Sequence, residues 1–260
     1  MILHFNKYQG TGNDFVMIDD RDEKFPVGNK SVIEFLTDRK MGVGADGVIL
    51  IQNHQEYDFK MVYYNPDGSE SLCGNGSRCA IAFAKNLGII EDTTTFETTD
   101  GVHEAFIEED IIHFQLHDVE NVNESNTDWF INTGSPHHIV IVDDLENVDI
   151  VEKGRKIRYS DAYAPSGTNV NFIEKDKTGI KVRTYERGVE DETLSCGTGV
   201  TACAIASSFF GYESPISIKA KGGDLSVSFD KVNGNKFENI YLAGPAEHVY
   251  QGKIELEINN

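Results

Sequence analysis

Two short stretches decide how the chain is read: CGNG at residues 73–76 and CGTG at residues 196–199. Each opens a largely apolar segment that ends at a glycine fifteen residues after the cysteine, Gly88 in one case and Gly211 in the other. Two matching openings followed by segments of equal length indicate an internal repeat, which has to be recognised before any single motif is interpreted.

Two further pairs of segments support a duplication. Residues 13–20 (NDFVMIDD) align with residues 137–144 (HHIVIVDD) at an offset of 124. Residues 59–65 align with residues 180–186 at an offset of 121, and the two cysteines lie 123 residues apart. The three offsets agree to within a few residues, so we predict two domains with the same fold.

Strand and helix patterns recur in both halves. Runs rich in β-branched and aromatic residues, bounded by Gly, Asn and Asp, predict short strands. The strands are expected at residues 48–51, 59–64, 94–98, 111–116, 139–142, 170–173, 180–185, 216–219 and 225–229. Helices are expected at residues 30–40, at residues 148–159 and directly after each CGxG stretch, with Gly88 and Gly211 as helix-ending residues.

The helix after the second CGxG stretch favours a particular architecture. Its segment at residues 201–210 (TACAIASSFF) has little polar face, so we expect it to be enclosed on all sides. We therefore predict an α+β fold of two pseudo-symmetric domains, each a mixed sheet wrapped around a central buried helix, with the active site in the cleft between them. The predicted domains are residues 1–118 and residues 119–260, and the C-terminal strand is expected to complete the first.

Composition and charge exclude several classes of protein. The chain has 260 residues, of which 39% are hydrophobic and 25% charged, a profile typical of globular proteins. A formal charge of −20 repels phosphate, so neither nucleic acid nor an anionic membrane is expected as a partner. No apolar run approaches the roughly 20 residues of a membrane span, and no secretory signal is readable at the start. We expect a cytoplasmic protein.

Four cysteines are present, and they fall into two kinds. Without a secretory signal they are expected to be reduced thiols, and because none stands in a C-x-x-C pair, no metal site is expected. Cys79 and Cys203 lie inside the predicted helices, occupy different registers of the repeat and are interpreted as core residues. Cys73 and Cys196 keep the same place before Gly-x-Gly in both halves, which indicates a role in a site.

A cysteine at a helix start has two chemical consequences. Unpaired N–H groups and the positive end of the helix dipole favour the thiolate, and the same groups bind a carboxylate. Two such cysteines, related by the repeat and facing one ligand, are suited to invert a stereocentre: one removes the α-proton and the other returns a proton to the opposite face. Donors at the helix starts would stabilise the carbanion formed in between. Nothing in the sequence indicates a cofactor.

Seven blocks, in order, resemble the diaminopimelate epimerase family along the whole chain. They are YQGTGNDF at residues 8–15, GVGADG at 42–47, NPDGS at 65–69, CGNGSRC at 73–79, GSPH at 134–137, GTNVNF at 167–172, and YERG at 185–188 followed by CGTG at 196–199. The resemblance implies a cofactor-independent isomerase that interconverts LL- and meso-diaminopimelate in lysine and peptidoglycan precursor synthesis. It also implies the two-domain fold of that family, and we expect a homodimer.

The resemblance also implies roles for individual residues. Cys73 and Cys196 would be the two catalytic bases, and His137 and Glu186 would tune the thiols. The reacting carboxylate would be held by Gly74, Asn75, Gly197 and Thr198. The distal end of the substrate would be recognised by Asn13, Asn65, Asn169, Glu186 and Arg187. The chain departs from many members at Gly47, where they carry Gln, and at Ser135, where they carry Asn, and Arg78 is expected to be structural.

Three other functions stay open. A proline or hydroxyproline racemase of the same architecture would keep both cysteines but would need no distal polar set. A thiol redox protein would use Cys73 and Cys196 as an exchangeable pair, and a non-catalytic binder would tolerate Cys→Ser. Neither of the last two explains the paired helix starts together with the distal polar residues.

Overall fold

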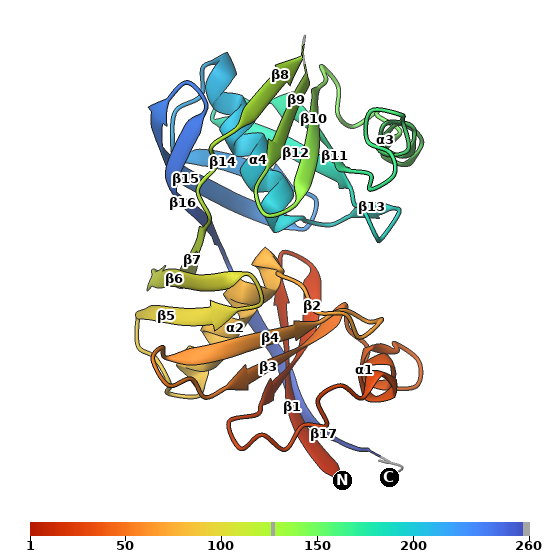
Figure 1. The fold of residues 1–260 in the computed structure, drawn as a ribbon, viewed down its shortest axis with the longest axis vertical. Coiled ribbons are helices and arrows are strands. Elements are labelled where there is room, and N and C mark those ends of the chain that lie inside the picture. Colours follow the sequence, from red (N-terminus) through yellow and green to blue (C-terminus); the bar gives the residue numbers. More distant parts are fainter. Residues whose placement is uncertain (126–127, 257–260) are drawn as a thin grey trace. The chain divides into compact units, whose positions relative to one another are not determined.

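The computed structural model describes residues 1–125 and 128–256 and divides into two compact units (Figure 1). Unit 1 comprises Met1–Phe114 and the chain from Pro245 onward, and unit 2 comprises Gln115–Gly244. A division of the chain at residues 118 and 119 stays a prediction. Among the described residues, no helix is both long and apolar enough to cross a membrane.

Unit 1 is built on a mixed sheet whose strands follow a fixed order. That order is β17 (Glu247–Glu255), β1 (Ile2–Gly10), β2 (Asn13–Asp19), β3 (Gly47–Gln52), β4 (Phe59–Tyr64), β5 (Thr93–Thr98), β6 (Gly101–Glu108) and β7 (Ile111–Leu116), of which the part up to Phe114 belongs to unit 1. The pairs β2–β3 and β4–β5 are parallel, and the other five neighbouring pairs are antiparallel. The C-terminal strand β17 therefore begins this sheet.

Unit 2 repeats this order with strands of its own. They are β8 (Val122–Ser125), β9 (Asp128–Asn132), β10 (Pro136–Ile141), β11 (Asn169–Lys175), β12 (Gly179–Tyr185), β14 (Ile216–Ala220), β15 (Gly223–Asn233) and β16 (Lys236–Gly244), with the short β13 (Glu192–Thr193) also beside β12. Leaving β13 aside, the sequence of parallel and antiparallel pairs is the same as in unit 1. The predicted pseudo-symmetric α+β fold is confirmed.

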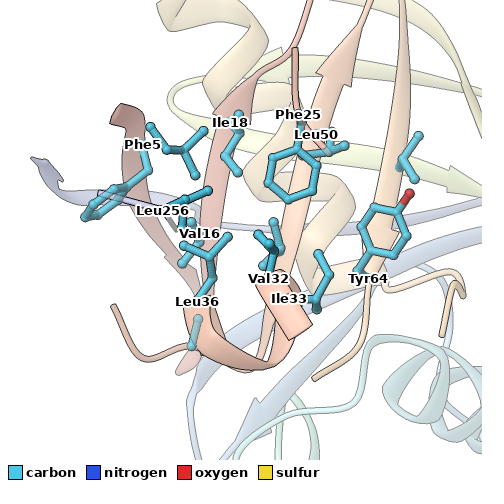
Figure 2. Close-up of a cluster of buried hydrophobic side chains, with 14 residues drawn as sticks. Phe5, Val16, Ile18, Phe25, Val32, Ile33, Leu36, Leu50, Tyr64 and Leu256 are labelled. Atoms are coloured by element: carbon cyan, nitrogen blue, oxygen red, sulfur yellow. The ribbon is translucent and has the colours of Figure 1, made fainter. Parts of the chain in front are cut away.

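In unit 1 a helix packs on each face of the sheet. Helix α1 (Lys30–Thr37) places Val32, Ile33 and Leu36 in a buried cluster with strand residues such as Val16 and Leu50 (Figure 2). On the other face lies α2 (Gly74–Asn86), whose Phe83 ring centroid is 5.7 Å from that of Tyr8. Strands covered on both faces are expected to read as continuous apolar runs. Accordingly, all four residues from Phe15 to Ile18 are buried.

Unit 2 uses its two helices in the same way. Helix α3 (Ile150–Arg158) packs Ile150 against Val170, Phe172 and Tyr185 of the sheet. Helix α4 (Gly197–Ser207) is buried along its whole length except at Thr198. Of the segment at residues 201–210 that was expected to be enclosed on all sides, residues 201–207 are buried and residues 208–210 are half-buried. A short 3₁₀ turn, η1 (Ser208–Phe210), then leads to Gly211.

The predicted helix-ending glycines adopt the backbone conformation that glycine favours. Gly88 has a φ of +70° and Gly211 has a φ of +101°, both in the left-handed region. Helix α2 ends two residues before Gly88, and η1 ends directly before Gly211. Both glycines therefore stop their helical segments as the sequence predicts.

The strand registers correct one alignment of the repeat. Val48 pairs with Tyr64 as Val170 pairs with Tyr185, so β3 and β11 correspond at an offset of 122. In the adjoining parallel pairs, Phe15 lies opposite Gly47 and His137 lies opposite Asn169. Phe15 is therefore the counterpart of His137, and the predicted offset of 124 for these strands is wrong by two residues. A slip of two residues leaves every side chain on its original face, so the pattern of apolar residues did not reveal it.

Candidate active site

The two candidate cysteines cap the two central helices in nearly the same conformation. Cys73 precedes α2 with φ −135° and ψ 109°, and Cys196 precedes α4 with φ −121° and ψ 110°. The carbonyl of Cys73 accepts a hydrogen bond from Ser77 N–H (2.7 Å), and that of Cys196 from Val200 N–H (2.9 Å). Both thiols therefore stand beside N–H groups of a first helical turn, where a negative charge is stabilised.

The second glycine of each CGxG stretch allows its helix to begin close to the sheet. A Cβ atom at Gly76 would lie 2.9 Å from Ile49 Cδ1 and 3.3 Å from the Cβ of Cys73. A Cβ atom at Gly199 would lie 2.6 Å from Asn171 Oδ1. Ile49 and Asn171 are counterparts at the offset of 122. The helix glycine therefore lies against an apolar side chain in unit 1 and against an amide in unit 2.

In unit 1 the thiol of Cys73 faces an amide oxygen. Its Sγ lies 3.6 Å from Asn13 Oδ1, to which the S–H donates, and accepts from Gly76 N–H at 3.4 Å. The same Asn13 oxygen accepts from Asn75 Nδ2 at 3.3 Å. The structure thus brings together three of the predicted site residues, Asn13, Cys73 and Asn75.

A chain of ion pairs fixes the orientation of Asn13. Its Nδ2 donates to Asp46 Oδ2 at 2.6 Å, so its Oδ1 is the atom left to face the thiol. Arg39 donates to Asp46 at 2.7 Å and to both oxygens of Asp14, and Lys7 is paired with Asp14 at 2.7 Å. Burial opposes the charged form of Asp14, but hydrogen bonds from Arg39 and Lys7 lower its pKa to about 2.

Arg78 lies beneath the first turn of α2. Its guanidinium is fully buried and donates to Asn75 Oδ1 and Thr11 Oγ1, each at 3.1 Å, and to the Gly74 carbonyl at 3.5 Å. Burial lowers the pKa of Arg78 to about 10, so it remains a cation at neutral pH. Arg78 therefore supports Asn75 and Gly74 from behind, in keeping with the structural role expected from the sequence.

In unit 2 the thiol of Cys196 faces a hydroxyl. Its Sγ lies 3.6 Å from Thr198 Oγ1, which in turn lies 3.0 Å from His137 Nε2. The other ring nitrogen of His137, Nδ1, lies 3.1 Å from Asn171 Nδ2. Burial, together with the charge of Arg187, lowers the pKa of His137 to about 3. The imidazole is therefore neutral at physiological pH, and the predicted site residues Cys196, Thr198 and His137 lie in one hydrogen-bonded group.

Three more predicted residues lie at the adjoining ends of β11 and β12. Asn169 Nδ2 donates to Ser135 Oγ at 2.9 Å, and Asn169 Oδ1 accepts from the backbone N–H of Arg187 at 2.8 Å. The carboxylate of Glu186 accepts from Thr193 Oγ1 at 2.8 Å. Asn169, Glu186 and Arg187 thus form a polar group at one end of these two strands, and Asn169 lies opposite His137 in the pairing of β10 with β11.

Asn65 lies at the matching strand end of unit 1, where β4 stops. Its Nδ2 donates to the carbonyl and hydroxyl of Ser69, at 3.0 Å and 3.2 Å, and to Ser71 Oγ at 2.9 Å. Asn65 therefore organises the loop that leads into Cys73. Its counterpart at the offset of 121 is Glu186, so each sheet ends in a polar side chain at this position.

The departure at Gly47 has a steric cause. A Cβ atom at Gly47 would lie 2.3 Å from Tyr63 Cε2 and 2.7 Å from the Tyr64 carbonyl oxygen. The Tyr63 ring occupies the space that a longer side chain at residue 47 would need. The position of the Tyr63 ring therefore requires glycine at residue 47 in this chain.

The remaining two cysteines are core residues, as expected. Cys79 and Cys203 are fully buried in α2 and α4. Burial raises the pKa of both thiols far above its ordinary value. Neither supplies a thiolate at neutral pH.

Sequence reasoning missed three residues that orient the site. Asp46 holds Asn13, Asn171 contacts His137, and Thr184 Oγ1 donates to Asn171 Oδ1 at 2.9 Å. A signal for Asn171 was present in the segment NVNF, because alternate residues of a strand share a face and a buried amide needs hydrogen-bond partners. Asp46 and Thr184 carried no comparable signal.

Comparison with known proteins gives a consistent picture. A family model described as diaminopimelate epimerase matches residues 5–120 and 129–249. A diaminopimelate epimerase of Flavobacterium psychrophilum is 54% identical over 253 residues, covering 95% of this chain and 98% of the relative.

Solved structures share the fold at low sequence identity. A phenazine biosynthesis protein of the PhzF family from Bacillus anthracis has a TM-score of 0.76 at 16% identity, covering 98% of this chain and 100% of that one. A hydroxyproline epimerase from Agrobacterium vitis has a TM-score of 0.70 at 15% identity, covering 97% and 92%. At this level of identity the two structures support the architecture alone.

Proposed function

This chain belongs to the diaminopimelate epimerase family, and we propose that it interconverts LL- and meso-2,6-diaminopimelate without a cofactor. The observation that carries the proposal is the presence of two copies of one unit, each with a cysteine in the same conformation at the start of its central helix. The Flavobacterium psychrophilum relative carries the name of this activity, and the match covers nearly its full length. The reaction would serve lysine and peptidoglycan precursor synthesis.

The proposed chemistry is a proton transfer with two bases. One cysteine, as a thiolate, removes the α-proton, and the other, as a thiol, delivers a proton to the opposite face of the same carbon. Inversion therefore requires Cys73 and Cys196 to face the α-carbon from opposite sides, and the cleft between the two domains expected from the sequence stays a prediction. After one turnover the proton states of the two cysteines are exchanged, so the reverse reaction uses the same groups.

The carbanion between the two proton transfers needs stabilisation, because an amino-acid α-proton is very weakly acidic. N–H groups of Gly74 and Asn75 at the start of α2, and of Gly197 and Thr198 at the start of α4, are suited to bind the carboxylate on which charge accumulates. These donors are fixed before substrate arrives, so they need no reorganisation during the reaction.

The distal amino-acid end of the substrate would be read by the remaining polar residues. We assign this role to Asn13, Asn65, Asn169, Glu186 and Arg187. Arg187 offers a guanidinium suited to a bidentate contact with a carboxylate, and Glu186 offers a carboxylate for an ammonium group. A proline racemase has no distal group to read, so this set favours the diamino dicarboxylate.

Proton NMR in deuterated water tests the proposal. Reduced protein without added cofactor is incubated with LL-diaminopimelate and, in parallel, with L-proline, and the α-proton signals are followed. We expect exchange into diaminopimelate alone. Exchange into proline would move the assignment to the proline racemases, and exchange into neither would favour the redox or binding alternatives.

Two further expectations concern the protein in the cell. We propose that it acts in the cytoplasm, where its substrate class is made, and that it forms a homodimer. Sedimentation equilibrium at micromolar concentration is expected to give twice the mass of the 260-residue chain. A single-chain mass would contradict the dimer without bearing on the reaction.

A further inference from the structure

The hydrogen bonds around His137 have a direction that their partners determine. Asn171 Oδ1 accepts from the Thr184 hydroxyl at 2.9 Å, so its Nδ2 faces the other way. There Nδ2 lies 3.4 Å from the carbonyl oxygen of His138, an atom that can only accept. With the amide turned round, Oδ1 would instead face that carbonyl oxygen. The observed orientation of Asn171 is therefore the one in which Nδ2 donates.

The orientation of Asn171 selects the tautomer of His137. Because Asn171 Nδ2 donates to Nδ1 of the ring at 3.1 Å, Nδ1 carries no proton. The imidazole is completely buried and neutral, so its single proton is on Nε2. Nε2–H then donates to Thr198 Oγ1 at 3.0 Å. The Thr198 hydroxyl, having accepted this bond, has its own proton to donate to Cys196 Sγ at 3.6 Å.

We propose that Asn171 is a positioning residue that holds His137 as the Nε2–H tautomer and thereby directs the Thr198 hydroxyl as a donor to Cys196. This proposal rests on the proposed function, since it concerns one of its two bases. The Thr198 hydroxyl, as a donor to Cys196 Sγ, favours the thiolate there. Gly76 N–H also donates to Cys73 Sγ, but the Asn13 oxygen accepts the S–H of Cys73 and so favours the thiol. Cys196 is therefore the thiolate of the resting enzyme, and Cys73 holds the proton.

The pseudo-symmetry supports a specific role for Asn171. At the offset of 122, the counterparts of His137 and Asn171 are Phe15 and Ile49, which have no hydrogen-bonding side chain. Phe15 and Ile49 approach Gly76 as His137 and Asn171 approach Gly199. Apolar residues therefore satisfy the packing requirement of this position. The polar side chains of His137 and Asn171 are therefore not required for packing. Their hydrogen bonds through Thr198 to Cys196, here called the relay, account for them.

Two other titratable groups interact with His137 or Cys196 without involving Asn171. Arg187 contributes a positive charge to the surroundings of His137, and the buried Cys203 interacts with Cys196 as a neutral thiol. The experiment therefore holds pH constant and changes only the relay.

The first readout is the tautomer itself. Nitrogen-15 NMR of the full-length protein with labelled histidine distinguishes a protonated from an unprotonated ring nitrogen, and His137→Gln identifies the signals. We expect Nε2–H in the unsubstituted chain and Nδ1–H in Asn171→Asp, whose carboxylate accepts from Nδ1. A wild-type ring with its proton on Nδ1 would overturn the proposal whether or not any variant folds.

The second readout is the reactivity of Cys196. In a Cys73→Ala background, the rate of alkylation by iodoacetamide at constant pH reports the thiolate fraction of Cys196 once unfolded controls correct for Cys79 and Cys203. We expect Asn171→Leu, which adds no charge, and Thr184→Val to slow alkylation about tenfold, the effect of one hydrogen bond to a charged group. Thr133→Val is the matched control, since Thr133 donates to the Thr198 backbone carbonyl and lies outside the relay.

The outcomes separate this proposal from the proposed function. Unchanged alkylation in both Asn171→Leu and Thr184→Val would overturn the relay, even if α-proton exchange into diaminopimelate is normal. Slowing by Thr133→Val equal to that by Thr184→Val would also overturn it, because the effect would then be one of general packing. Loss of exchange with all substrates, with the tautomer and alkylation as expected, would overturn the epimerase and leave the relay standing.

Discussion

The starts of α2 and α4 have the same backbone and different side-chain chemistry. Cys73 and Cys196 differ by 14° in φ and 1° in ψ, from −135° and 109° to −121° and 110°. Yet Cys73 faces the amide oxygen of Asn13, whereas Cys196 faces a hydroxyl backed by a buried imidazole. The duplicated backbone thus determines where each thiol stands, and substitutions around it determine which thiol holds the proton.

The largest effect is expected from removing either thiol. Cys73→Ala and Cys196→Ala should each lower the rate of epimerisation by at least about 10³-fold, because each removes one of two acid/base groups. Cys79→Ala and Cys203→Ala remove thiols of the same helices that lie in the core, and they should keep most of the activity of whatever fraction folds. The coupled assay for meso-diaminopimelate measures all four. Equal losses in all four variants would break the distinction between site and core cysteines.

A helix glycine in each unit provides a sharper comparison. Gly199→Ala should lower activity about tenfold or more, since the new Cβ would lie 2.6 Å from Asn171 Oδ1 and would displace the amide. Gly76→Ala should cost less than about threefold, because its Cβ meets the end of the Ile49 side chain, which can turn away. Steady-state kinetics of both variants, with thermal unfolding as a control for folding, measure the difference. A larger loss in Gly76→Ala would contradict it.

Loss of the hydrogen bond that orients Asn13 is expected to lower activity by a factor similar to, or smaller than, that of Gly199→Ala. Asp46→Asn replaces the acceptor of Asn13 Nδ2 with an amide and weakens the bridge to Arg39. We expect about a tenfold fall in kcat/KM, mainly through kcat, since the Asn13 oxygen is no longer fixed toward Cys73. Asp22→Asn, at an exposed aspartate paired with Lys24, is the matched control. A fall confined to KM would indicate that Asn13 binds substrate without orienting the thiol.

Acid sensitivity should also differ between the units. The pKa of His137, about 3, lies below the ordinary value of 6.5. Between these two pH values the imidazole is protonated in the unfolded chain and neutral in the folded chain. Stability is therefore lost as pH falls from about 6.5 toward 3, by up to about 1.4 kcal/mol per pH unit. His137→Gln should flatten the curve of unfolding free energy between pH 4 and 6, as measured by urea denaturation. An unchanged slope would show that His137 is protonated in the folded state.

Asp14 is expected to give the smallest effect, at lower pH. Its pKa of about 2 lies below the ordinary 3.8, so its contribution is present above pH 3.8 and is lost as pH falls toward 2. Because Asp14 is only partly buried, we expect Asp14→Asn to cost roughly 1–2 kcal/mol at neutral pH. The difference from the unsubstituted chain should vanish near pH 2. A difference that persists there would point to lost hydrogen bonds in place of lost charge pairs.

Much of the fold follows from the sequence because local patterns carry it. Each predicted helix is present, and Gly88 and Gly211 end the central ones. The C-terminal strand β17 was expected without bounds, and several strands were not predicted, namely β1, β2, β6, β8, β9, β13 and β16. The segment EHVYQGKIE of β17 has no buried residue and no clear alternation, and its order comes from pairing with β1 about 250 residues earlier in the chain. A strand that is held by a partner so distant in the sequence need not show a local hydrophobic periodicity of its own.

The site shows the same division between local and distant information. Cys73 and Cys196 could be predicted because the repeat places both before Gly-x-Gly. The partner of His137 could not be predicted, since Asn171 reaches it only through the parallel pairing of β10 with β11. The two-residue error in aligning these strands hid that Phe15 replaces His137 in unit 1. The chemical difference between the two thiols therefore became visible only in the structure.

The most direct test of the central claim follows deuterium during the first turnovers of LL-diaminopimelate in deuterated water. A thiol carries one proton, so the proton removed by one cysteine cannot be the one delivered by the other. We predict that the first meso product carries deuterium at the inverted carbon while the remaining LL substrate keeps its α-proton. Deuterium appearing in recovered LL substrate as fast as in the product would show that a single base serves both faces, and it would contradict the two-thiol account.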